Sequence, residues 1–444
     1  MKLNNKRTFL VGLAFLSICA FWQMYDNIVP LILTKTFHMN ETLSGVIMAA
    51  DNVLALFLLP FFGGLSDKTH TKIGKRMPYI LFGTGCAIVL VNLLPILDNS
   101  YAASASPFKM ISFVVVLGLL LIAMGTYRSP AVALMPDVTP KPLRSKANAI
   151  INLMGAVGGV LYLALAAVMY PNAKTAGLDH VNYQPLFIAV ASIMFVAVGV
   201  LFLTIKEPKL VEENRALEAE HPEWDLAKDD GSGNEVLPPE VKRSLGFILA
   251  SIVLWFIAYN AVGTWFTTYI SVVMGQGLGG ASTCLLVGNA GAILSYIPVG
   301  IVASKVGRKK TIIFGVLLLT TCFILGFILT TVYSSINAIM YVLFALVGVA
   351  WASINVNSLP MVVEMCKGSD IGKFTGYYYT ASMAAQVVTP IVAGTLMRLI
   401  SYKVLFPYSA VFAALSFLTM LFVRHGDAKV EGKRGLEAYE DMGD

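Results

Sequence analysis

Residues 64–76 read GLSDKTHTKIGKR, and residues 300–310 read GIVASKVGRKK. Each stretch has a glycine, then Asp-Lys or Ser-Lys, then a second glycine followed by basic residues. Each stretch also follows a long apolar segment, at a corresponding place in its part of the chain. Matches of this kind indicate two duplicated halves, which membrane transporters often contain.

Twelve apolar segments surround these stretches. Of the 444 residues, 57% are hydrophobic and 13% are charged, a balance far more apolar than that of soluble domains. A bilayer core about 30 Å thick takes roughly 20 helical residues, whereas transmembrane strands would be shorter and would alternate in polarity. The sequence therefore predicts an all-α membrane protein with twelve transmembrane helices in two pseudo-symmetric six-helix bundles. The predicted spans are residues 9–33, 43–65, 79–97, 110–135, 148–170, 185–205, 244–273, 281–303, 311–331, 336–361, 374–398 and 404–423.

The distribution of Lys and Arg orients these helices. With the N-terminus inside, 26 of the 32 Lys and Arg residues fall on cytoplasmic segments, 5 fall on outer loops, and Arg128 lies within a span. Cytoplasmic loops of membrane proteins carry an excess of this kind. The sequence thus predicts a multi-pass protein of the cytoplasmic membrane with both termini in the cytoplasm.

A polar stretch divides the chain. Residues 206–243 are rich in charged residues and contain two consecutive prolines, which predicts a cytoplasmic linker with a short helix at 209–220. A small folded insertion is the alternative, although so few apolar residues cannot bury much core. The predicted organisation is an N-terminal bundle at 1–205, the linker at 206–243, a C-terminal bundle at 244–424 and a cytoplasmic tail at 425–444.

The repeated stretches indicate a gate at the cytoplasmic face. Asp137 precedes Lys146 by nine residues after the fourth span, as Glu364 precedes Lys373 after the tenth. An acid at a helix end can pair with basic residues, and glycine allows a loop to approach a helix closely. The general need for basic cytoplasmic loops is the alternative explanation, which two matching copies disfavour. The predicted inner-gate residues are Gly64, Asp67, Lys68, Gly74, Lys75, Arg76, Asp137, Arg144, Gly300, Ser304, Gly307, Arg308, Glu364 and Lys373.

These loops resemble the signature of the major facilitator superfamily, and the resemblance covers nearly the whole chain. Two stretches are similar to the glycoside–pentoside–hexuronide:cation symporters and the related sucrose-transporter-like branch. They are the continuation of the first loop at 77–79 (MPY) and residues 129–140 (SPAVALMPDVTP). This narrower resemblance implies uptake of a sugar or glycoside coupled to a proton or a sodium ion. Ser304 stands where the second loop usually has Asp, which implies a weaker C-terminal gate. Ala55 and Leu59 stand near where the sodium-coupled members carry acids, which favours a proton over sodium.

Three charged residues lie well inside the predicted spans: Asp26, Asp51 and Arg128. A charge at the centre of a membrane helix costs roughly 2.5–3.5 kcal/mol on insertion scales. At 1.5 Å per helical residue, both acids lie roughly 12–14 Å below the outer face and Arg128 roughly 13 Å from the inner face, so an Asp–Arg pair can form. The functional interpretation is solute binding by these charges, with a carboxylate that takes up the coupling proton. A structural ion pair is the alternative.

Amides and aromatic side chains accompany these charges in both halves. Amides bind hydroxyl groups, and aromatic rings pack on the C–H faces of sugars. For any single amide a hydrogen bond between helices is an equal alternative, but the whole set favours a neutral polyhydroxylated solute. We expect Tyr259 and Asn260 to face Asp26 and Arg128 from the opposite half. The other candidate residues are Tyr25, Asn27, Asn52, Trp255, Asn289, Asn355, Asn357 and Gln386.

The sequence therefore predicts a secondary transporter of a small polar solute, a sugar or glycoside, that works by alternating access and proton symport. A proton-coupled exporter of drugs or metabolites with the same fold is the alternative. The chain has no Walker-type phosphate loop and no cluster of catalytic side chains, so neither ATP-driven transport nor an enzyme is predicted. The expected partners are the lipid bilayer, the solute and the coupling cation. No nucleic acid, metal or cofactor is expected, and the protein is expected to be a monomer.

Overall fold

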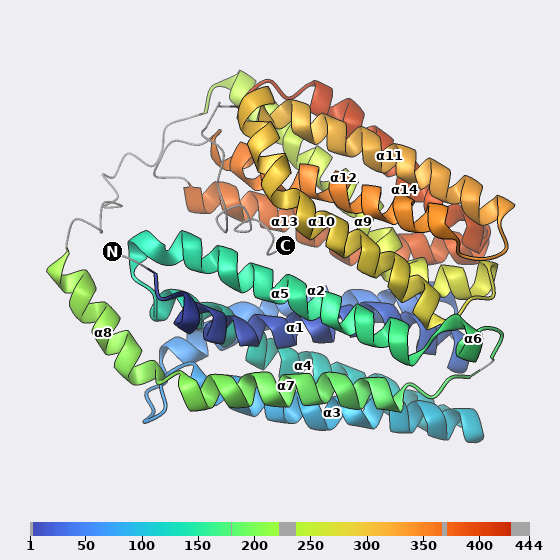
Figure 1. Cartoon of the computed structure of the whole chain (residues 1–444), viewed down its shortest axis with the longest axis horizontal. Helices are drawn as coiled ribbons and strands as arrows, with labels where there is room; N and C mark the ends of the chain where they lie inside the picture. The colour runs from blue at the N-terminus through green and yellow to red at the C-terminus, as the bar shows by residue number, and fades with distance from the viewer. Residues whose placement is uncertain (1–2, 179, 222–236, 366–370, 428–444) are drawn as a thin grey trace.

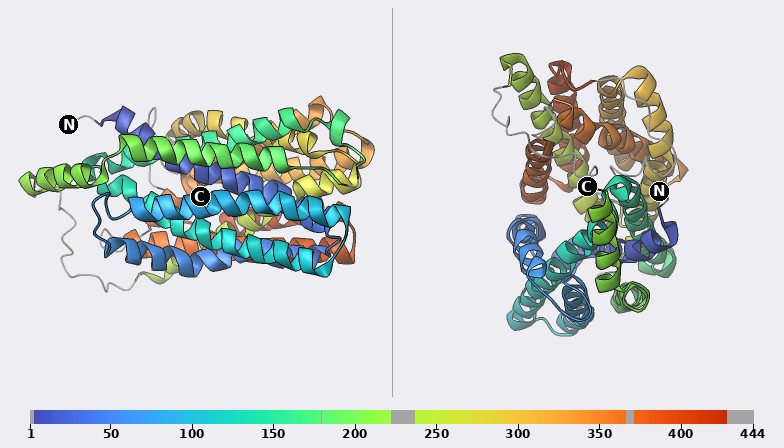
Figure 2. Two further views of the ribbon diagram at one scale, coloured as in Figure 1. Left: turned by 90° about the horizontal axis from the view of Figure 1, so that it is seen from below. Right: turned by 90° about the vertical axis from the view of Figure 1, so that its left-hand side faces the viewer.

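The structure is a computed structural model that describes residues 3–178, 180–221, 237–365 and 371–427. Two groups of long, roughly parallel helices lie side by side, one coloured blue to green and the other yellow to red (Figure 1). Figure 2 shows the same two groups from below and from one end. The halves seen in space therefore correspond to the first and second parts of the sequence.

The helices of the first half alternate in direction along the chain. They are α1 (Asn5–Leu31), continued by the π-helix η1 (Ile32–Thr36), α2 (Glu41–Asp67), α3 (Met77–Ala103), α4 (Pro107–Asp137), the 3-10 helix η2 (Lys141–Leu143), α5 (Arg144–Met169), the short α6 (Asn172–Thr175) and α7 (Gln184–Thr204). The helix α8 (Glu207–Glu220) follows.

The second half repeats this alternation. Its helices are α9 (Pro239–Val273), α10 (Leu278–Val306), α11 (Arg308–Val332), α12 (Ala338–Val363), α13 (Ile371–Leu399), the 3-10 helix η5 (Tyr402–Val404) and α14 (Leu405–Leu421).

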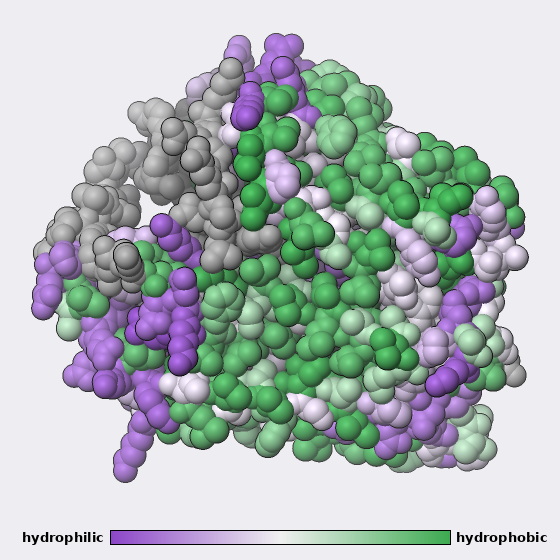
Figure 3. All heavy atoms as spheres, viewed as in Figure 1, coloured by the Kyte–Doolittle hydropathy of each residue, from purple (hydrophilic) through white to green (hydrophobic). Residues whose placement is uncertain are grey.

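Twelve helices of the described part are long and apolar enough to cross a membrane. Each corresponds to one predicted span, which confirms the predicted helix count. The helices extend beyond the apolar segments: α9, for example, begins at Pro239, because proline at a first helical position loses no hydrogen bond and a polar helix end can continue into water. Figure 3 shows apolar residues across the middle of one face and polar residues gathered toward its two ends.

Each half has its own hydrophobic core, one formed almost entirely by residues 11–205 and the other by residues 245–423. Among the described residues the halves pack together mainly through three pairs of long helices, α2 on α13, α5 on α10 and α1 on α9, and the short α6 also contacts α10. α8 lies at one end of the bundle and α6 at the other (Figure 1). We call these the α8 end and the α6 end.

Candidate functional site

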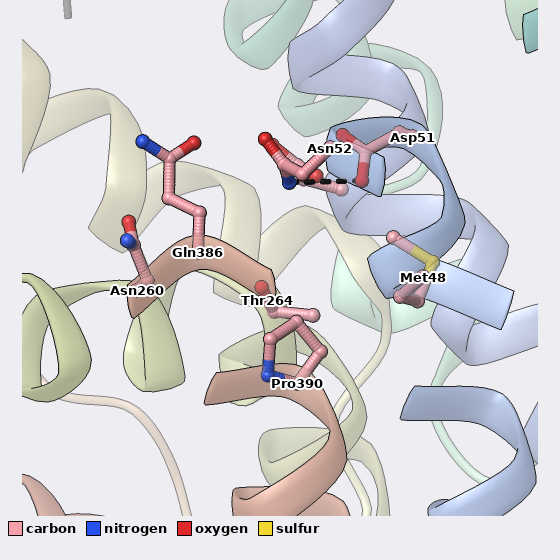
Figure 4. A pocket seen from close by; sticks show the side chains of 8 residues that line it. Met48, Asp51, Asn52, Asn260, Thr264, Gln386 and Pro390 are labelled. Carbon is pink, nitrogen blue, oxygen red and sulfur yellow. Dashed lines mark hydrogen bonds between the residues drawn. The ribbon is translucent and has the colours of Figure 1, made fainter. Parts of the chain in front are cut away.

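A pocket lies where the two halves meet, with walls from α1, α2, α9 and α13. Its empty volume, which includes space open to solvent, is about 380 Å³. Figure 4 shows Asp51 and Asn52 on one side and Gln386 and Asn260 on the other. A solute bound there would contact both halves at once. The lining residues are Asp26, Met48, Asp51, Asn52, Asn260, Thr264, Gln386 and Pro390.

Five of these eight residues are among the predicted candidates, and three were missed. Met48, Thr264 and Pro390 each lie four residues, about one helical turn, from a predicted pocket residue. Residues four apart share a helix face, so this spacing was the signal that could have identified all three.

Two pocket residues precede a proline by four positions. Because proline has no backbone N–H, Pro30 leaves the carbonyl oxygen of Asp26 without its usual helical donor, and Pro390 does the same to Gln386. The carbonyl oxygen of Pro390 itself accepts a hydrogen bond from Trp265 Nε1 at 3.2 Å. The helical hydrogen bonding of α1 and of α13 thus lacks one bond beside the pocket.

The two carboxylates of the pocket differ in their surroundings. Asn52 Nδ2 donates to Asp51 Oδ1 at 2.9 Å, whereas no described residue hydrogen-bonds or ion-pairs with the Asp26 side chain. Across the pocket, the buried amide nitrogen of Asn260 has no hydrogen-bond partner among the described residues. Asp26 and Asn260 therefore offer a free acceptor and a free donor on opposite sides.

The expected ion pair between an acid and Arg128 is wrong. The Arg128 guanidinium lies over the Trp22 ring, 5.9 Å from its centroid, and Arg128 forms no ion pair with a described acid. The heights of these residues in the membrane allowed a pair, but height does not fix the direction in which a side chain leaves its helix. Arg128 is thus not among the residues that line the pocket, although its charge acts on Asp51.

The remaining candidates lie outside the pocket. Tyr259 stacks on Trp351 with ring centroids 3.8 Å apart, so it does not face Asp26 as expected. Trp255 is buried in the core of the second half. Asn355 Nδ2 donates to the Tyr296 hydroxyl at 3.2 Å, and Asn357 Nδ2 donates to a carbonyl of its own helix at 2.9 Å. Asn289 is half-buried.

Two candidates beside Asp26 connect α1 to its neighbours. The Tyr25 hydroxyl donates to the carbonyl oxygen of Ile47 at 3.4 Å. Asn27 Oδ1 accepts a hydrogen bond from the Thr267 hydroxyl at 2.9 Å, which joins α1 of one half to α9 of the other. Both side chains therefore connect helices that form the walls of the pocket.

Close backbone packing lies beyond the pocket toward the α6 end. A Cβ atom at Gly45 would come within 2.3 Å of the Pro390 carbonyl oxygen, and one at Gly394 within 2.4 Å of the Glu41 carbonyl oxygen. The Tyr402 hydroxyl donates to Glu41 Oε1 at 2.5 Å. At Gly45 and Gly394 the backbones of α2 and α13 thus approach each other closely.

A second contact joins the halves at the α6 end. Asn172 Oδ1 accepts hydrogen bonds from the backbone N–H groups of Gly277, at 3.0 Å, and Gly280, at 3.1 Å, and its amide donates to Gln276. Because α10 begins at Leu278, the asparagine of one half caps a helix of the other.

The inner-gate motif forms a cluster at the α8 end of the first half. Arg76, which is 5% exposed, contacts Asp67 and donates from Nε to Asp137 Oδ2 at 2.8 Å. It also donates to the Ser66 hydroxyl at 2.5 Å, and Lys75 Nζ lies 3.1 Å from Asp137 Oδ2. The predicted pairing of acids with basic residues is thus present in this half.

The second copy of the motif is built differently. Arg308 contacts Glu364, but the Ser304 hydroxyl donates to the Ile301 carbonyl of its own helix at 2.8 Å. Serine at this position therefore adds no charge pair, in agreement with the expected asymmetry. Lys68 and Lys373 are exposed.

Only the second glycine of each motif has a structural requirement. Gly74 and Gly307 have φ values of 118° and 105°, which side chains rarely adopt. A Cβ atom at Gly64 or Gly300 would meet no atom within 4 Å. The expected close approach at these first glycines is therefore wrong.

Comparison with known proteins places the chain among transporters. The sequence pattern of the Major Facilitator Superfamily matches residues 11–295 and 280–439. The chain is 28% identical to sucrose transport protein SUC3 of Arabidopsis thaliana over 145 residues, which are 30% of this chain and 24% of the relative. It is 27% identical to the alpha-ketoglutarate permease of Escherichia coli over 179 residues, 40% of this chain and 38% of the relative. The chain thus spans well under half the length of these relatives.

Solved transporters share the fold. The inward-open xylose transporter XylE of E. coli superposes with a TM-score of 0.67 at 14% identity, covering 99% of this chain and 98% of that one. The nucleoside transporter NupG superposes with a TM-score of 0.62 at 14% identity, covering 95% of this chain and 100% of that one. The predicted fold class, two six-helix bundles, is confirmed.

Proposed function

The chain belongs to the major facilitator superfamily and is a multi-pass membrane transporter, not an enzyme, and from this premise we propose that it takes up a neutral sugar or glycoside with a proton. The pocket between the halves supports this proposal. It combines two carboxylates with uncharged hydrogen-bonding groups from both halves, the side chains of Asn52, Asn260, Thr264 and Gln386.

The solute class follows from these uncharged groups. Amides and hydroxyls bind the hydroxyl groups of a neutral solute without a charge of their own to neutralise. The free amide nitrogen of Asn260 would donate to an oxygen of such a solute. The name of the sucrose transport relative supports the same class.

Asp26 is the better candidate for the coupling proton. Asp51 already accepts a hydrogen bond from Asn52. Asp26 lacks such a donor among the described residues, and like Asp51 it lies on a helix that contacts the other half. A change in the protonation of Asp26 would therefore alter the charge at the contact between the two halves.

Orientation and movement complete the proposal. The excess of Lys and Arg supports a cytoplasmic position for the α8 end, and in that orientation the contacts at the α6 end would close the outer side. Rocking of the two halves about the pocket would open that side and close the inner one. The lipid bilayer, the solute and the proton are the proposed partners, and a monomer suffices.

The rival function is export in exchange for protons. Two carboxylates without a described cation in the pocket wall would also suit a positively charged solute. The direction of coupled flux separates the two functions.

Uptake into proteoliposomes tests the proposal. We expect radiolabelled sugars or glycosides from a panel to accumulate when a proton gradient is imposed inward, with little response to a sodium gradient. Empty liposomes serve as the control. Expulsion of an organic cation by an inward proton gradient, with no sugar accumulation, would establish the rival function instead.

Asn172→Ala is expected to open the α6 end. The variant loses hydrogen bonds that exist only while that end is closed, and because each is worth about 0.5–1.5 kcal/mol, the closed-to-open ratio should fall about tenfold or more. Labelling of a Met48→Cys thiol by an impermeant maleimide added from the α6 side measures this ratio. Asn99→Ala is the matched control, because Asn99 bonds only within its own half to Asn182 and His180 among the described residues. Equal labelling in both variants would contradict a gate at Asn172.

A further inference from the structure

A buried acid connects the segment between the halves to the inner-gate cluster. Glu207 is the first residue of α8 and lies in the stretch predicted to be a cytoplasmic linker. Its side chain nevertheless is 1% exposed. A charged residue buried to this extent needs strong partners, because burial of an unpaired charge costs several kcal/mol.

The partners of Glu207 are backbone groups at the start of α3. Its Oε1 accepts from the N–H of Lys75 at 2.7 Å and of Arg76 at 2.9 Å, and its Oε2 accepts from the N–H of Met77 at 2.8 Å. α3 begins at Met77, so these are N–H groups that the helix cannot satisfy itself. A carboxylate is also favoured there by the positive end of the helix dipole.

Gly74 leaves the room for this carboxylate. A Cβ atom at Gly74 would lie 2.2 Å from Glu207 Oε2, and the backbone there has a φ of 118°. Gly74 therefore leaves the space that the Glu207 carboxylate occupies. The loop that carries the motif and the helix α8 thus pack together.

Further contacts hold α8 against the same end of the first half. Asn214 Nδ2 donates to the carbonyl oxygen of Asp137 at 3.2 Å, and Arg144 Nη2 donates to Glu218 Oε1 at 3.1 Å. α8 thus contacts the start of α3, the end of α4 and the start of α5. These are the elements that carry the gate residues.

We propose that Glu207 is a positioning residue of the inner gate. It holds the backbone N–H of Arg76, the residue whose guanidinium contacts both Asp67 and Asp137. By fixing that backbone, Glu207 directs the guanidinium toward both acids and joins α2, α3 and α4 into one unit. The proposal rests on the alternating access proposed above, but it needs neither the solute class nor the coupling ion.

Glu207→Gln tests this role without removing bulk. The amide keeps the length of the side chain but loses the charge and one acceptor oxygen. Hydrogen–deuterium exchange at the backbone amides of residues 75–77 should accelerate about tenfold, since hydrogen bonds to charged groups are the stronger ones. Glu212→Gln, an exposed position of the same helix, is the matched control and should leave this exchange unchanged.

A second measurement separates positioning from mere stability. In a Met48→Cys background, labelling of the pocket thiol from the α8 side should rise about threefold or more in Glu207→Gln, because a loosened cluster closes that end less often. Glu207→Asp, which keeps the charge, should restore part of the parent labelling. If Glu207→Gln lowers only the melting temperature and labelling from the two sides stays in the parent ratio, Glu207 is structural and the proposal is wrong. Unchanged exchange at residues 75–77 would overturn it as well, whereas failure of sugar uptake alone would reject the proposed solute and leave both measurements intact.

Discussion

Asp26→Asn is expected to abolish accumulation of the solute while exchange of solute across the membrane persists. The amide keeps the shape and polarity of the pocket wall, so binding and rocking remain, but it cannot carry the coupling proton. At a membrane potential of 100 mV one proton supplies about 2.3 kcal/mol, or roughly 50-fold accumulation. The variant should bring this ratio down to about one, measured in proteoliposomes by gradient-driven uptake and by counterflow.

Two further variants assign the effect to the proton. Asp26→Glu retains a carboxylate and should keep part of the accumulation. Asp51→Asn should weaken solute binding yet leave accumulation measurable, because Asp51 is already hydrogen-bonded to Asn52. If Asp26→Asn accumulates solute as well as the parent does, Asp26 is not the coupling group.

Arg76→Ala is expected to be the most destabilising change at the α8 end. The substitution leaves Asp137, whose side chain is 20% exposed, without its closest partner, and it also removes the contact with Asp67. Breaking a buried ion pair from one side costs roughly 3–5 kcal/mol, and the lower part of that range applies because Asp67 is 58% exposed. A fall in the melting temperature of the purified protein would measure this loss.

Lys75→Ala is the matched control for the gate arginine. Lys75 neighbours Arg76 and reaches the same Asp137 oxygen at 3.1 Å, but its side chain is 23% exposed and makes no other described side-chain contact. Ion pairs near the surface contribute about 0–1 kcal/mol. If the Lys75→Ala variant were as unstable as Arg76→Ala, the positive charge alone would stabilise the cluster, and the several contacts of the buried guanidinium would not be needed.

The sequence predicted the helices well because hydrophobicity and charge act along one dimension. A membrane imposes a minimum length on each apolar segment, and Lys and Arg collect on one side. Residues such as Asp26 and Asp51 stand out for the same reason, since charges inside spans are rare. The structure places both in the pocket.

The direction of each side chain around its helix could not be predicted in this way. Arg128 was expected beside an acid at the same depth, but it lies over Trp22. Tyr259 precedes the pocket residue Asn260 by one position, which turns it about 100° around the helix axis, onto Trp351. Which face of a helix meets the other half depends on packing between distant segments, and one sequence does not record this.

Glu207 was missed for a different reason. Its partners are backbone N–H groups, and every residue except proline has one. No residue type in the loop at 72–77 therefore indicates that a carboxylate binds there. The only local sign was Gly74, which was expected only to allow the loop to approach a helix closely.

The contact between α2 and α13 has a consequence for how fast the protein can cycle. Where Gly45 and Gly394 meet carbonyl oxygens of the opposite helix, neither residue places a side chain of its own between the helices. The two glycines therefore add no rotamer to be freed or refrozen when the helices part, a change that costs up to about 2 kcal/mol of conformational entropy for each long side chain. Separation of α2 from α13 at the α6 end has instead to break polar bonds such as the one between Tyr402 and Glu41.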